Sequence, residues 1–108
     1  MPKTLDGCLS IVCDVLGKQG VDITGITGDI SFGELIRYVD KLKDAKSPFS
    51  CFEHFITAQA AYMRHWMNHF GIEVNDVNAA KVIDNEDYQQ CFWGWYHGRY
   101  MQNVISFD

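Results

Sequence analysis

Apolar side chains recur every three or four residues along most of this chain, the spacing that places them on one face of an α-helix. Near the N-terminus, Thr4 can cap a helix, and Gly20 can end it in a left-handed turn. The pattern therefore predicts a helix over residues 5–18. Its buried face would consist of Leu5, Cys8, Leu9, Val12, Val15 and Leu16.

A capping box marks the start of a second helix. Ser31 and Glu34 lie three residues apart, so the serine can accept a hydrogen bond from the glutamate amide while the glutamate reaches back. A helix is predicted over residues 31–45. The preceding segment, residues 20–30, holds three glycines but lacks the lysine and the spacing of a phosphate-binding loop. We expect it to be a connection whose apolar side chains fill the core.

A second capping box, Ser50 and Glu53, begins the longest predicted helix, over residues 50–70. Gly71 follows it and is suited to end it. Most of its aromatic and long apolar side chains are expected on one broad face, with Gln59 in the middle. A buried amide needs partners, so Gln59 should hydrogen-bond to another helix or to a ligand.

Two short polar segments predict the last two helices. Asn75 or Asp76 can start a helix over residues 76–84, and Asn85 can cap a final helix over residues 86–102. The acidic residues after Asn85 lie where the helix dipole favours negative charge, so capping accounts for this acidic run.

Length and composition agree with one folded domain. A chain of 108 residues with 47% hydrophobic and 21% charged residues is typical of a single globular unit. Five helices with short connections predict a single all-α domain over residues 1–108, a helical bundle. The formal charge of −5 argues against a protein that binds DNA directly, because such proteins usually present a basic face.

Aromatic residues make up 14% of the chain, and thirteen of the fifteen lie at or after Phe49. On the last helix they spread over a wide arc, while Cys91, Gly94 and Gly98 form a side of small residues that another helix could approach closely. Two interpretations stay open. The arc is buried in the core, or part of it is exposed and binds a partner.

The interface interpretation names four residues. Tyr, Trp and Arg predominate among the residues that carry binding energy at protein interfaces. The partner-binding residues would then be Trp93, Tyr96, Arg99 and Tyr100. An exposed stripe of this kind also allows a homodimer about a two-fold axis.

The histidines offer an alternative chemistry. His65 and His69 are four residues apart on one helix face, which is the spacing of two metal ligands, and His54 lies on nearly the same side. A site for zinc or another divalent metal would need a further ligand, such as His97 or Cys91. The HExxH motif is absent, and no side chain supplies an obvious general base.

No motif of nucleophilic or acid–base catalysis occurs, so we expect a protein that is not an enzyme. The preferred hypothesis is a small acidic interaction module, an inhibitor or antagonist of the immunity or virus-encoded anti-defence type. Its protein partner would be, for example, a nucleic-acid-handling protein, whose basic surface an acidic rim would attract. The alternative is a helical domain that binds a metal or small ligand. No apolar run is long enough to cross a membrane, and four scattered cysteines without a secretory leader favour the cytoplasm.

Overall fold

The computed structural model describes residues 6–44 and 51–101, and this part of the chain is helical without strands. The helices are α1 (Gly7–Lys18), α2 (Phe32–Asp44), α3 (Cys51–His69), α4 (Asp76–Ile83) and α5 (Glu86–Tyr96), and a π-helical turn, η1 (His97–Met101), continues α5. The prediction of an all-α domain is confirmed.

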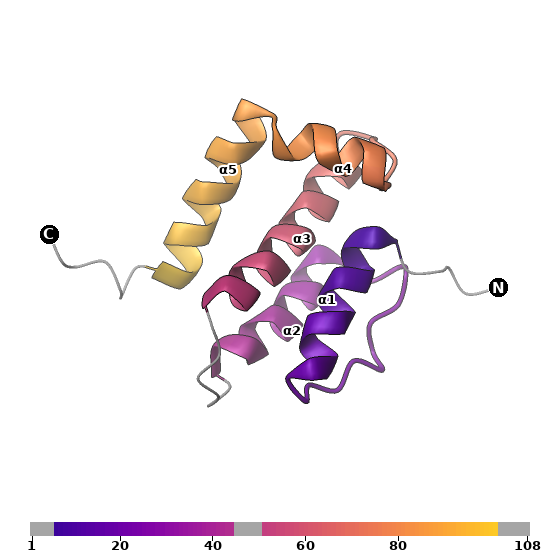
Figure 1. Ribbon diagram of the computed structural model, residues 1–108, viewed down its shortest axis with the longest axis vertical. Coiled ribbons are helices and arrows are strands. Elements are labelled where there is room, and N and C mark those ends of the chain that lie inside the picture. The colour runs from indigo at the N-terminus through magenta and orange to yellow at the C-terminus, as the bar shows by residue number, and fades with distance from the viewer. Residues whose placement is uncertain (1–5, 45–50, 102–108) are drawn as a thin grey trace, which may run out of the picture.

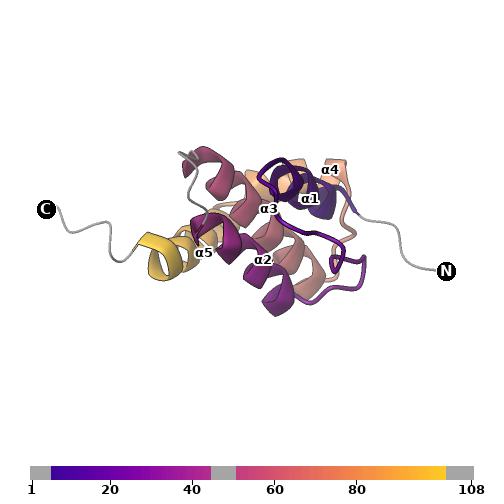
Figure 2. The ribbon, with the colours of Figure 1, turned by 90° about the horizontal axis from the view of Figure 1, so that it is seen from below.

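Helix α3 is the centre of the fold (Figure 1). Helices α1 and α2 pack on it, α4 crosses near its C-terminal end, and α5 runs along its other side. Seen from below, α5 lies at one edge of the molecule and α1 and α4 lie toward the opposite edge (Figure 2). The molecule is only 20 Å thick along its shortest axis, which is about two helix diameters.

Most predicted helix ends are confirmed by their hydrogen bonds. The Ser31 hydroxyl accepts from the Glu34 amide and donates to its carboxylate, both at 3.2 Å. Asn75 and Asn85 cap α4 and α5. Gly20 and Gly71, with φ of 81° and 69°, form the left-handed turns that follow α1 and α3.

Helix α1 is capped differently from the prediction. Asp6, not Thr4, is the N-cap, and its Oδ1 accepts from the Leu9 amide at 2.8 Å. A capping oxygen serves only the two or three residues that follow it, so a helix that begins at Gly7 takes its cap from Asp6. Thr4 lies outside the described residues, as does Ser50 of the second capping box.

Helix α3 is buried on two sides rather than on the single broad face that its pattern predicts. It packs on α1 and α2 and also on α5, and its rings contact both α2 and α5, since Tyr62 meets Phe32 of α2 and Phe55 meets Phe92 of α5. The most buried side chains of α3 are those of Thr57, Ala58, Ala61 and Met67. Phe70, one of the aromatic residues of the predicted helix over residues 50–70, is 57% exposed and follows His69, the last residue of α3.

The connection between α1 and α2 fills the core as predicted. Ile26 and Ile30 are buried, and Val21 and Ile23 pack against the same cluster. A single cluster of buried apolar residues therefore joins this loop to α1, α2, α3, α4 and α5. No helix in the described part of the chain is long and apolar enough to span a membrane.

The last helix departs from its prediction at its C-terminal end. Residues 86–102 were expected to form one α-helix, but the α-helical hydrogen bonding ends at Tyr96 and a wider π-turn follows. Within that turn, Arg99 and Tyr100 both reach Asp40 on α2. The contacts with α2 accompany the wider turn, which also includes Gly98, a residue without a side chain. Residue 102 lies outside the described part.

Candidate functional site

The aromatic arc of α5 divides into a buried and an exposed part. Tyr88, Phe92, Tyr96 and Tyr100 are all at most 6% exposed, because they pack against rings of α3. Trp95 is half-buried, with its ring stacked on Tyr62 at 4.9 Å. The core therefore takes up most of the aromatic surplus of the sequence.

Of the three tryptophans, Trp93 is the one that the core does not enclose. It is 46% exposed, whereas Trp66 and Trp95 are half-buried. One side of its indole packs against Phe55 at a centroid distance of 5.4 Å, and His97 meets it edge-on at 5.1 Å. These neighbours hold the indole in place while the rest of the ring faces solvent.

The other three predicted interface residues have different environments. The Tyr100 hydroxyl donates to Asp40 at 2.9 Å, and Arg99 forms an ion pair with the same carboxylate at 2.7 Å. The hydroxyl oxygen of Tyr96 lies 3.0 Å from Nδ1 of His54, within hydrogen-bond distance. Of the four, only Trp93 and Arg99 are exposed, and the charge of Arg99 is already paired with Asp40.

Asp40 links α2 to η1, because its carboxylate accepts hydrogen bonds from both Arg99 and Tyr100. Burial raises the pKa of the Tyr100 hydroxyl, and the neighbouring Asp40 carboxylate raises it further because a second negative charge there would be repelled. Tyr100 thus stays protonated and donates its hydrogen bond over the whole physiological pH range. The ring of the same tyrosine meets His54 edge-on at 4.4 Å. Tyr100 is a structural residue that joins α2, α3 and η1.

Within the predicted metal row, His54 and His65 lie in different environments. His54 is 7% exposed and lies among the rings of Tyr96 and Tyr100. His65 stacks on Phe32 at 4.3 Å, and its pKa is lowered by partial burial and by the neighbouring His69. In the part of the chain that the structure describes, no three His, Cys, Asp or Glu side chains gather in a way that would hold a metal ion.

The two glycines on the small-residue side of α5 are not packed against another helix in the described part of the chain. A methyl group added at Gly94 or at Gly98 would have nothing within 4 Å among the described residues. Cys91, on the same side, is exposed. The close helix approach that these residues were expected to allow is therefore not made by another described helix of this chain.

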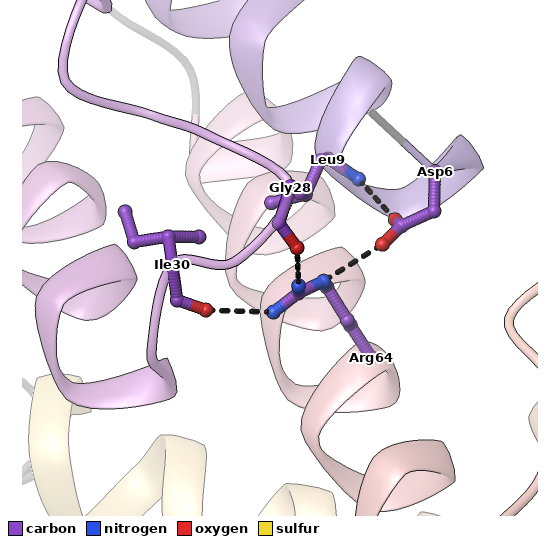
Figure 3. Close-up of polar contacts among 5 residues, drawn as sticks. All are labelled: Asp6, Leu9, Gly28, Ile30 and Arg64. Atoms are coloured by element: carbon purple, nitrogen blue, oxygen red, sulfur yellow. Dashed lines mark hydrogen bonds and ion pairs between the residues drawn. The ribbon is translucent and has the colours of Figure 1, made fainter. Parts of the chain in front are cut away.

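Sequence reasoning missed the central polar contact of the fold, which is made by Arg64 (Figure 3). Its guanidinium is buried among α1, α3 and the loop before α2, where it donates to the Asp6 carboxylate and to two backbone carbonyls. The carbonyls are those of Gly28 and Ile30, at 2.9 and 3.1 Å. The feature of the sequence that could have indicated this contact is a single charged residue, Arg64, within the mainly apolar segment between Ala60 and Met67.

Gln59 lies on α3 and is half-buried. Its side chain lines a groove between α1, α3 and α4, and its backbone carbonyl accepts a long hydrogen bond of 3.4 Å from the Tyr88 hydroxyl. This contact is made by the backbone of Gln59, whereas the prediction concerned its side-chain amide.

Comparison of the chain with models of known protein families, with curated proteins and with solved structures finds no match. Function must therefore be argued from the residues and their geometry.

Proposed function

We propose that this protein is a small non-enzymatic interaction module that binds a partner protein through the exposed part of α5, with Trp93 as its anchor. The observation that carries the proposal is that one tryptophan is 46% exposed on a helix whose Tyr88, Phe92 and Tyr96 rings are buried. Tryptophan is the residue type most typical of interface hot spots.

The environment of Trp93 suits an anchor residue. Phe55 and His97 pack against its indole and restrict its side-chain rotamers before a partner arrives. A pre-ordered side chain loses less conformational entropy on binding, which is worth about 0.5–1.5 kcal/mol for each side chain immobilised. Burial of the exposed ring surface would add a favourable term of about 25 cal/mol per Å².

The charge of the C-terminal third indicates the character of the partner. Residues 71–108 carry six acidic and two basic residues, and one of the two bases, Arg99, is paired with Asp40. A basic partner surface would be attracted by these acidic side chains and would associate faster. Proteins that handle nucleic acids present such surfaces, and an antagonist of such a protein is the role we propose.

Affinity capture tests this proposal. Tagged wild-type protein, Trp93→Ala and a control variant, Phe70→Ala, would each be incubated with a lysate of the native source, and retained proteins identified by mass spectrometry. Phe70 is also an exposed ring, at 57%, but lies at the far end of α3. The proposal expects one protein that wild type and Phe70→Ala retain and Trp93→Ala loses. Sedimentation of the purified chain beforehand identifies the case in which the partner is a second copy.

A further inference from the structure

A groove of about 270 Å³ lies between α1, α3 and α4, and its walls are almost entirely apolar. Cys8 and Ile11 line it from α1, Ile56 and Met63 from α3, and Ile83 from α4. Ile11 and Ile83 are 45% and 41% exposed, so two large aliphatic side chains on opposite helices remain in contact with water. This groove shares no lining residue with the surroundings of Trp93.

The wall of the groove on α4 is one face of that helix. Along α4, the lining residues Asp76, Ala79, Ala80 and Ile83 follow the spacing of a single helix face. An apolar face at that spacing normally packs against another helix. Here part of the face borders the groove instead.

Acidic side chains stand at both ends of this face. Asp76 begins α4 and lines the groove, and Asp84 follows Ile83 as the C-cap residue. Asp84 is eight positions after Asp76, which corresponds to about 12 Å along an α-helix. Asp76 is the acidic residue in the lining itself, and the segment that forms this wall, residues 71–87, holds five acidic side chains and one basic side chain.

We infer that the groove binds an amphipathic helix of a partner protein, with leucine-like side chains inserted between Ile11 and Ile83. Lysine or arginine side chains about two helical turns apart on that helix would meet Asp76 and Asp84. This is the mode of recognition in which a helix lays its apolar face into a groove and its flanking charges set the register.

A model peptide tests this inference directly. The probe is a fluorescein-labelled 14-residue peptide of leucine and lysine, with the leucines on one helical face, and the measurement is fluorescence anisotropy. A second peptide has the same composition in scrambled order, and a third has glutamate in place of lysine. We expect binding of the first peptide, and at least about tenfold weaker binding of the other two.

Variants of the protein locate the binding. Ile83→Glu should weaken binding of the first peptide about tenfold or more, and the double variant Asp76→Asn with Asp84→Asn should weaken it several-fold. Val77→Glu is the matched control, because Val77 is on the same helix, is 66% exposed and does not line the groove. If Ile83→Glu fails to fold, Ile11→Glu, on the opposite wall, takes its place.

The inference is overturned if the scrambled peptide binds as well as the amphipathic one, or if Val77→Glu weakens binding as much as Ile83→Glu. It is also overturned if the groove is closed by a second copy of the chain, seen as a dimer that Ile83→Glu dissociates. Trp93→Ala should leave peptide affinity unchanged. Loss of peptide binding in that variant would place the peptide on α5 and contradict the groove as its site.

Discussion

The Arg64 guanidinium and the Asp6 carboxylate, 58 residues apart in sequence, form an ion pair in which Nε and Oδ2 are 2.8 Å apart. Asp6 uses its other oxygen to cap α1, so one carboxylate both starts a helix and anchors a buried cation. The remaining Arg64 donors hold the carbonyls of Gly28 and Ile30. This contact fastens α1 and the loop before α2 to the central helix.

Loss of this cation should destabilise the fold strongly. Arg64→Met leaves Asp6 without its partner and two loop carbonyls without their donors, and we expect a loss of about 3–5 kcal/mol in the free energy of unfolding. Lys18→Ala, which removes an exposed ion pair with Asp14, should cost less than about 1 kcal/mol. Urea denaturation measures both. Equal effects of the two variants would contradict the assigned role of Arg64.

The two roles of Asp6 can be separated by substitution. Asp6→Asn keeps an oxygen that can accept from the Leu9 amide but removes the charge that faces Arg64. Asp6→Ala removes both, and its free energy of unfolding should be lower than that of Asp6→Asn by about 1 kcal/mol, the typical contribution of an N-cap. If the two variants are equally stable, the cap contributes nothing measurable.

Stability should fall at alkaline pH. Burial raises the pKa of the Tyr100 hydroxyl, with a further rise from Asp40, so the folded state keeps a proton that the unfolded chain releases near pH ~10. The contribution is complete below that pH and is lost as pH rises, with a slope of at most about 1.4 kcal/mol per pH unit for one proton. Urea denaturation at pH 8.5, 10 and 11 should show this fall, and Tyr100→Phe should make it less steep, because burial also raises the pKa values of Tyr88 and Cys8, which remain. An unchanged slope in Tyr100→Phe would exclude Tyr100 as its source.

The cysteines should differ in reactivity. Burial raises the pKa of the Cys8 thiol to about 11, with a further rise from Asp6, whereas Cys91 is exposed. In a Cys51→Ser background, which removes a side chain outside the described part, 5,5′-dithiobis(2-nitrobenzoic acid) at pH 8 should react rapidly with one thiol per native chain. Denatured protein should show three. A second fast thiol in the native state would show that Cys8 or Cys13 is accessible.

Local signals predicted the helices well because caps, left-handed glycines and apolar periodicity all act within a few residues. Asn85 starts α5 and Gly71 ends α3, and each does so through a hydrogen bond to a residue three positions away. The role of Arg64 was not predictable in this way. Its partners come from a loop and from the start of α1, and their meeting depends on how three segments pack.

The same limit applies to the aromatic helix. Periodicity placed Trp93, Tyr96 and Tyr100 on one wide arc and could not say which part of it faces α3. Packing buries the two tyrosines and leaves Trp93 half exposed. Of the four residues predicted at the interface, only Trp93 and Arg99 are exposed, and the charge of Arg99 is already paired with Asp40.

The most direct test of the proposed role of Trp93 compares it with its neighbour Phe92 in urea denaturation. Phe92 is 1% exposed, so Phe92→Ala should lower the free energy of unfolding by about 3–5 kcal/mol. If Trp93 is available to a partner and not required by the core, Trp93→Ala should cost no more than about 1–2 kcal/mol and leave the chain folded. A loss in Trp93→Ala as large as that in Phe92→Ala would show that the indole belongs to the core, and would contradict its use as the anchor of an interface.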